Sequence, residues 1–133
     1  MRSAPTSSSA PRILLVEDDD GVREGLRRVL AAEGWLVTAV GNVEKSLEHL
    51  RQQRTDLLIT DLFMAPISGW DLLFHEGLHR PELPIFVISA LSGSLSDGAD
   101  QVACEYFQKP VDLGALVAAI HRHLSKAVAP LKL

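Results

Sequence analysis

The sequence predicts an α/β fold in which helices cover both faces of a parallel sheet. Short, continuously apolar runs recur along the chain, as expected of strands that are buried on both faces. Between these runs, apolar residues recur with helical spacing. Five strands that alternate with helices in this way predict a doubly wound, three-layer α/β/α sandwich.

Five runs are predicted to be strands. Four of them have the composition of buried strands, and the fifth is shorter. In chain order they are "RILLVE" (12–17), "WLVTAV" (35–40), "DLLIT" (56–60), "PIFVIS" (84–89) and "CEYFQ" (104–108).

The helices are predicted from apolar residues three or four positions apart. The first helix ends at Gly34, the second follows Asn42 as its N-cap, and the last follows Asp112 as its N-cap. A weaker pattern predicts a third helix over residues 69–78. The segment 91–103 is rich in Gly and Ser and has few apolar residues, so we expect a short or irregular fourth helix there.

Length and composition indicate one domain. We expect residues 12–126 to form it, between a disordered Ser/Ala/Pro-rich tail (1–11) and a C-terminal tail (127–133). The formal net charge of −4 argues against direct nucleic-acid binding and against an anionic membrane surface. No run approaches the roughly 18 apolar residues of a membrane span. The single cysteine, Cys104, excludes an internal disulfide and predicts a reducing, cytoplasmic location.

Chemically active side chains follow four of the five predicted strands. Glu17 and Asp18 follow the first, Asp61 follows the third, Ser89 ends the fourth and Lys109 follows the fifth. In open parallel sheets, ligands bind beyond the carboxyl ends of the strands. The second strand has no such side chain at its end, as expected of an edge strand away from a binding site.

These residue types predict a phosphoryl site. The carboxylates of Glu17, Asp18 and Asp61 need positive charge nearby if all three are to be ionised. Mg²⁺ would supply it, because this ion takes few protein carboxylates and keeps several waters. Lys109 and Ser89 would add an ammonium and a hydroxyl for phosphoryl oxygens. Asp61 is the best-placed nucleophile, since an aspartate can accept a phosphoryl group as an acyl phosphate.

Four segments carry a resemblance to a known family. They are "LLVEDD", "DLLITDLFM", "PIFVISA" and "EYFQKP", in this order and at matching spacings. In them the chain, from about Arg12 to Leu124, resembles the receiver domain of two-component response regulators, the chemotaxis regulators included. The resemblance implies the flavodoxin-like fold with strand order 2-1-3-4-5.

The resemblance also implies an acceptor and a metal site. Asp61 would accept a phosphoryl group from a phosphohistidine, on a sensor histidine kinase or on a histidine phosphotransfer protein. Glu17, Asp18 and Asp61 would bind Mg²⁺ together with the backbone carbonyl of Phe63. No other cofactor is implied.

The remaining family positions would respond to the phosphoryl group. Ser89 would bind one of its oxygens, and Lys109 would pair with the acceptor and then with the phosphoryl group. Tyr106 matches the aromatic residue that swings inward when the hydroxyl residue moves. The peptide bond between Lys109 and Pro110 would be cis.

Some features depart from the family pattern or lie outside it. The usual proline falls four residues after the acceptor, where this chain has Ala65 and then Pro66. The loop beyond Asp61 is therefore expected to have its own shape. Asp19 and Asp20 are expected to trail into the loop after the first strand, to face water and to lie outside the metal's ligands.

Plainer interpretations of the same residues stay open at this point. Glu17 and Asp18 could form a solvated acidic turn at the start of a helix. Ser89 could end its strand without a role, and Lys109 could be a surface lysine before a turn proline. For Tyr106, simple packing competes evenly with switching.

The leading functional interpretation is a receiver that catalyses only its own phosphorylation and dephosphorylation. Phosphorylation would change its binding to a downstream protein that the sequence does not identify. One alternative is a degenerate receiver that binds its partner without phosphorylation. The other is a Mg²⁺-dependent aspartyl phosphotransferase, although Phe63 stands where such enzymes carry a second acid. The sequence leaves open whether the chain is a monomer or a homodimer.

Overall fold

The computed structural model describes residues 10–61, 80, 82–90 and 105–128 of the chain. Within these residues, five parallel strands form one sheet in the order β2-β1-β3-β4-β5. The fold class predicted from the sequence and the strand order implied by the family resemblance are therefore confirmed. The strands are β1 (Arg12–Val16), β2 (Leu36–Val40), β3 (Leu57–Asp61), β4 (Ile85–Ser89) and β5 (Glu105–Gln108).

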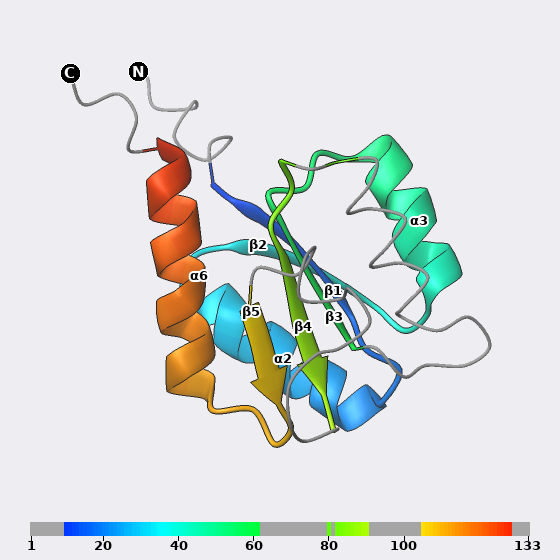
Figure 1. The fold of residues 1–133 in the computed structure, drawn as a ribbon. Coiled ribbons are helices and arrows are strands. Elements are labelled where there is room, and N and C mark those ends of the chain that lie inside the picture. Colours follow the sequence, from blue (N-terminus) through cyan, green and yellow to red (C-terminus); the bar gives the residue numbers. More distant parts are fainter. Residues whose placement is uncertain (1–9, 62–79, 81, 91–104, 129–133) are drawn as a thin grey trace.

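Three helices cover the sheet in the described part of the chain. They are α2 (Asp20–Ala32), α3 (Val43–Gln52) and α6 (Leu113–Val128). Figure 1 shows α2 and α6 against one face of the sheet and α3 against the other, which gives the three layers expected. None of these helices combines the length and the apolar character that crossing a membrane requires. The predicted third and fourth helices lie outside the described residues.

The core has two halves because successive strand residues point to opposite faces of the sheet. Ile13 and Leu15 of β1 pack on the side of α2 and α6. Leu14 and Val16 pack on the side of α3. We call the second group the α3-side core; its buried members are Leu14, Val16, Val43, Leu50, Leu58, Leu83, Ile85 and Val87. Burial on both faces explains why β1, β3 and β4 are continuous apolar runs.

The edge strands are less buried than the sequence predicted. We expected residues 35–40 to form a buried strand, but β2 is only partly buried, and Leu36 keeps 45% of its surface exposed. β5, at the opposite edge, is likewise partly buried. The edge position of β2 was expected, but an edge strand has a neighbour on one side only and is therefore less buried than its apolar composition suggests.

The helix ends follow from local side-chain chemistry. Gly34 adopts a φ of +100° after α2, which is a conformation that favours glycine. The predicted N-caps of α3 and α6 are confirmed, and α2 has an N-cap that the sequence analysis did not assign. The carboxylate or amide oxygens of Asp19, Asn42 and Asp112 accept hydrogen bonds from the backbone N–H groups of Val22 (2.9 Å), Lys45 (2.8 Å) and Ala115 (3.0 Å), respectively.

We expect Asn42→Ala to lower the free energy of unfolding by about 1 kcal/mol, because the mutation leaves the N–H group of Lys45 without its cap. Urea denaturation followed by circular dichroism measures this loss. Asn42→Asp retains a capping oxygen and should stay close to wild type. An Asn42→Ala variant as stable as wild type would show that the cap contributes nothing.

Candidate functional site

The ends of the central strands bring the predicted site residues to one edge of the sheet. Asp61 is the last residue of β3 and pairs in register with Ile88 of β4, so Ser89 lies one position further on. Glu17 and Asp18 directly follow β1, which is the other neighbour of β3. Since each strand is apolar up to this edge, the first polar side chains meet where the strands end.

Lys109, which follows the edge strand β5, pairs with one residue at the end of β3 and one directly after β1. Its ammonium nitrogen, Nζ, lies 2.6 Å from Oδ2 of Asp61 and 2.7 Å from Oε1 of Glu17. Its backbone N–H donates to the carbonyl of Ser89 at 2.7 Å, which fixes the chain as it leaves β5. The Lys109–Pro110 peptide bond is cis, as the family resemblance implied.

Three carboxylates gather around this ammonium group. Each of Glu17, Asp18 and Asp61 offers one oxygen, and these three oxygens lie within 4.8 Å of one another. Glu17 and Asp61 are buried, whereas Asp18 is exposed. The expectation that the three acids converge is therefore met, and the interpretation of Glu17 and Asp18 as a merely solvated turn does not fit a buried Glu17.

Burial and pairing shift two pKa values in this cluster. Burial raises the pKa of Glu17, and the negative charge of Asp61 adds to this shift, while hydrogen bonds from Lys109 and from the backbone of Asp19 oppose it. For Lys109, burial by itself lowers the pKa. The hydrogen bonds and charges of Asp61 and Glu17 outweigh this effect and raise it. Lys109 therefore carries a full positive charge at neutral pH.

The donor set fits a hard divalent cation. Oε1 of Glu17 is fully buried, and its one close partner among the described residues is the ammonium group of Lys109 at 2.7 Å. Two buried carboxylates and an exposed third one provide oxygen ligands on one side and access for water on the other. This arrangement suits Mg²⁺, which binds one or two carboxylates and keeps several waters. Phe63, whose carbonyl was the fourth expected ligand, lies outside the described residues.

The acids after Asp18 differ in part from the prediction. Asp19 and Asp20 are exposed, as expected, but they do not trail into a loop. Asp19 caps α2, and Asp20 is the first residue of that helix. A carboxylate at a helix N-terminus is favoured by the backbone N–H groups there, and this preference starts the helix earlier than its apolar pattern suggests.

Sequence reasoning missed Arg23. Its guanidinium donates to the backbone carbonyl of Glu17 through Nη1 at 2.9 Å and to the carboxylate of Asp20 through Nη2 at 2.6 Å. The three-residue spacing from Asp20 to Arg23 was a readable signal for the second contact, because such residues are neighbours on a helix. The first contact depends on how α2 packs against β1, which no local pattern encodes.

The structure also locates the two remaining predicted site residues. Ser89 is fully buried at the end of β4. Tyr106 is half-buried in β5, pairs in register with Val87 and packs against the α3-side core. This position explains Tyr106 as a packing residue and leaves the switching role as a proposal.

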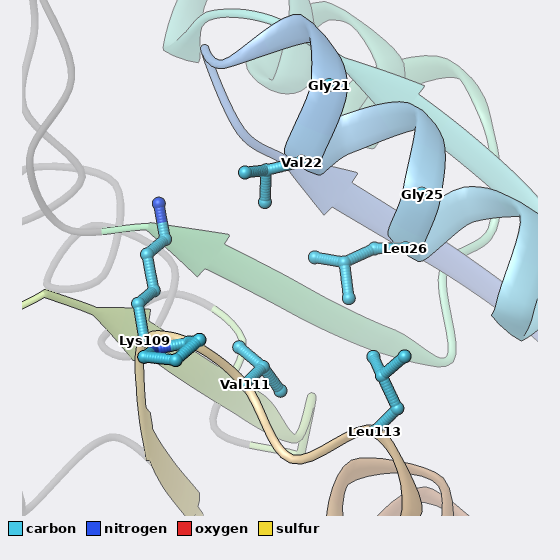
Figure 2. A pocket seen from close by; sticks show the side chains of 8 residues that line it. Gly21, Val22, Gly25, Leu26, Lys109, Val111 and Leu113 are labelled. Carbon is cyan, nitrogen blue, oxygen red and sulfur yellow. The ribbon is translucent and has the colours of Figure 1, made fainter.

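An apolar pocket of about 480 Å³ adjoins the acidic cluster. It lies between the first turns of α2 and the segment that follows β5 (Figure 2). Val22 and Leu26 project from α2 towards Val111 and Leu113, and Lys109 stands at the border of the pocket. The same lysine therefore contacts both the carboxylates and an apolar surface.

Comparison with known families agrees with this geometry. The family model of the response regulator receiver domain matches residues 13–121. The chain belongs to this family. Its function is therefore that of a response regulator receiver domain of two-component systems, as the sequence indicated.

Individual relatives of this receiver domain are longer regulators. It is 35% identical over 124 residues to the DNA-binding transcriptional regulator NtrC of Azospirillum brasilense, covering 92% of this chain but 26% of that protein. It is also 35% identical over 118 residues to the response regulator MprA of Mycobacterium leprae, covering 86% of this chain and 51% of that protein. The chain thus spans between a quarter and about half of these relatives.

Solved structures give the same assignment. The response regulator TrrA of Thermotoga maritima, in complex with Mg²⁺-BeF, superimposes with a TM-score of 0.79 at 28% identity, covering 85% of this chain and 98% of TrrA. A CheY-like receiver domain of Methanospirillum hungatei superimposes with a TM-score of 0.81 at 24% identity, covering 89% of this chain and 96% of that one. The second comparison supports the fold alone.

We expect Mg²⁺ to stabilise this receiver domain and EDTA to remove the effect. At a free Mg²⁺ concentration of 100 times Kd, the free energy of unfolding should rise by about 2.7 kcal/mol, because the ion binds only the folded cluster. Thermal and urea unfolding with and without Mg²⁺ measure this difference.

Two variants test whether the gain depends on the carboxylate cluster. Asp18→Asn should lose most of it. Glu24→Gln removes an exposed acid one turn along α2, outside the cluster, and should keep it. An equal gain in wild type and Asp18→Asn would place the ion elsewhere.

Proposed function

We propose that Asp61 is the phospho-acceptor of this receiver domain and that Glu17, Asp18 and Asp61 bind the Mg²⁺ that phosphorylation requires. The observation that supports this proposal best is the position of Lys109. Its ammonium nitrogen lies within 2.7 Å of both buried carboxylates. A buried aspartate that is held by an ammonium group and flanked by two more acids suits nucleophilic attack on a phosphoryl group.

In the proposed reaction, a carboxylate oxygen of Asp61 attacks the phosphorus of a phosphohistidine. The new P–O bond gives an acyl phosphate, and the P–N bond breaks with its electron pair leaving on the imidazole nitrogen. Bound Mg²⁺ would neutralise charge on the phosphoryl oxygens. Lys109 would move part of its ion pairing from Asp61 to those oxygens, and the hydroxyl of Ser89 would donate to one of them.

The partners belong to the same proposal. We propose a sensor histidine kinase or a histidine phosphotransfer protein as the phosphodonor, and a protein target whose binding changes after transfer. Within this proposal Tyr106 responds to Ser89, and the chain remains free of direct nucleic-acid contacts. The DNA-binding activity named for the NtrC relative belongs to a protein of which this chain spans 26%. Family membership and the single cysteine support a cytoplasmic location.

Two rival functions make different demands on the site. A degenerate receiver would need neither a complete acidic cluster nor a lysine in contact with the acceptor, yet both are present. A phosphotransferase would turn over an external phosphoester many times. We propose instead that the chemistry is confined to this chain's own aspartate, so that one phosphoryl group is gained per molecule.

With Mg²⁺ and a small acyl phosphate or phosphoramidate, we expect the protein to gain the mass of one phosphoryl group. Asp61→Asn should abolish the gain, because an amide cannot form the acyl phosphate. Intact-protein mass spectrometry reads the outcome directly.

Asp112→Asn is the matched control, since it makes the same chemical change at the exposed N-cap of α6 and retains a capping oxygen. It should be modified like wild type. An unmodified wild-type protein would favour the degenerate receiver, and release of many phosphates per molecule from a phosphoester would favour the enzyme.

A further inference from the structure

Arg23, in α2, contacts residues in and beside the acidic cluster: Glu17, which follows β1, and Asp20 of its own helix. Its side chain is only 25% exposed although it starts from a helix that faces solvent. Nη1 donates to the carbonyl of Glu17, and Nη2 pairs with Asp20, whose side chain is 90% exposed. The outer contact holds the guanidinium in place, and the inner contact reaches the end of β1.

The inner contact falls on the peptide group that carries Asp18. The carbonyl of Glu17 belongs to the peptide bond between Glu17 and Asp18. On the other side of Asp18, the N–H of Asp19 donates to Oε2 of Glu17 at 2.9 Å. Both peptide groups that flank Asp18 are therefore held, one of them by Arg23.

The side chain of Asp18 has no comparable support of its own. It is exposed, and within the described part of the chain no hydrogen bond or ion pair holds its carboxylate. The direction of this carboxylate is consequently set by its backbone. If the peptide before Asp18 rotates, the carboxylate leaves the 4.8 Å cluster that it forms with Glu17 and Asp61.

Because Gly41 has no side chain, the guanidinium of Arg23 can occupy the space beside it. A Cβ atom at Gly41 would lie 3.0 Å from Nη1 of Arg23, 3.7 Å from its Cζ and 4.0 Å from the carbonyl oxygen of Glu17. Such a Cβ would press on the guanidinium at the point where it donates to Glu17. Gly41 follows β2, the strand with no polar residue at its end, so this strand contributes to the site by leaving room.

We propose that Arg23 is a positioning residue for metal binding: it fixes the Glu17–Asp18 peptide so that the exposed Asp18 carboxylate points at the cation. The inference rests on the proposed Mg²⁺ site and extends it to a residue that touches neither the metal nor the phosphoryl group. Gly41 contributes to the same positioning, because it leaves room for the guanidinium of Arg23. Groups that orient metal ligands in this way strongly affect metal affinity.

The direction in which the Mg²⁺ affinity changes when Arg23 is replaced distinguishes a positioning role from a purely electrostatic role and from a purely structural one. Arg23 carries a positive charge near a cation site, so a purely electrostatic role predicts tighter Mg²⁺ binding when the charge is removed. A purely structural role predicts lower stability but an unchanged Mg²⁺ affinity in the folded protein. Positioning predicts weaker Mg²⁺ binding in spite of the more favourable electrostatics.

The test is the Mg²⁺ dissociation constant, measured by calorimetry and by amide chemical shifts with Mg²⁺ alone. Arg23→Gln should bind Mg²⁺ about 10-fold more weakly than wild type. Arg23→Lys keeps the charge but not the planar fork, and should fall between the two. Gly41→Ala changes no charge and should weaken binding in the same direction by a smaller factor.

Arg27→Gln is the matched control, because it makes the same substitution one turn along α2, on a guanidinium that pairs only with Glu24 among the described residues. It should leave the dissociation constant unchanged. Phosphorylation by a small donor adds an independent readout. The phosphorylation rate of Arg23→Gln should be low at limiting Mg²⁺ and should approach the wild-type rate at saturating Mg²⁺. Structural damage would lower this rate at every Mg²⁺ concentration.

Folded Arg23→Gln that binds Mg²⁺ as tightly as wild type, or more tightly, would overturn the inference and leave the proposed function intact. If Arg23→Gln does not fold, unchanged affinity in both Arg23→Lys and Gly41→Ala would overturn it equally. A wild-type chain that binds no Mg²⁺ would overturn the proposed function and the inference with it.

Discussion

The ammonium group of Lys109 lies between two buried carboxylates that would otherwise repel each other at the carboxyl ends of β1 and β3. Removing one partner of a buried ion pair costs about 3–5 kcal/mol, because the remaining charge is left without compensation. Lys109, which follows β5, therefore offsets the charge of Glu17, just after β1, and of Asp61, at the end of β3. The sheet order 2-1-3-4-5 achieves this by setting β1 and β3 side by side in its centre. Asp61, which Lys109 contacts at 2.6 Å, is the residue that we propose as the nucleophile.

The four consecutive acids from Glu17 to Asp20 illustrate how one charged run is divided among different tasks. Glu17 turns inward to Lys109, and Asp18 faces the position suited to a cation. Asp19 caps α2 with its carboxylate, and Asp20 pairs with Arg23 at the surface. Three of these charges thus have a cationic side chain or backbone N–H groups nearby, and the fourth, Asp18, lies in the cluster proposed to bind Mg²⁺. The run is tolerated because its members point in different directions, which the change from strand to helix imposes.

Local pattern was enough to predict the strands, most of the described helices and the residues that meet at the sheet edge, whereas the strand order came from the family resemblance. Buried strands such as β3 open with a continuous apolar run, here Leu57, Leu58 and Ile59, and α3 begins at the residue after Asn42, as its capping oxygen indicates. Asp61 and Lys109 could be found because each lies at or directly after the end of a predicted strand. The edge position of β2 was expected, but its partial exposure was not, because its apolar composition resembles that of the central strands. The role of Arg23 was not predicted either, because its contact with Glu17 depends on the packing of α2 against β1 and not on sequence spacing.

A double-mutant cycle between Glu17 and Lys109 tests the central interaction most directly. The free energies of unfolding of wild type, Glu17→Gln, Lys109→Gln and the double variant would be measured by urea denaturation at neutral pH in EDTA. If the lysine compensates the buried carboxylate, the coupling energy should be at least about 1 kcal/mol, with the two side chains stabilising each other. Additive effects, with a coupling energy near zero, would contradict the account, because Lys109 would then not be the charge that makes the buried acids tolerable.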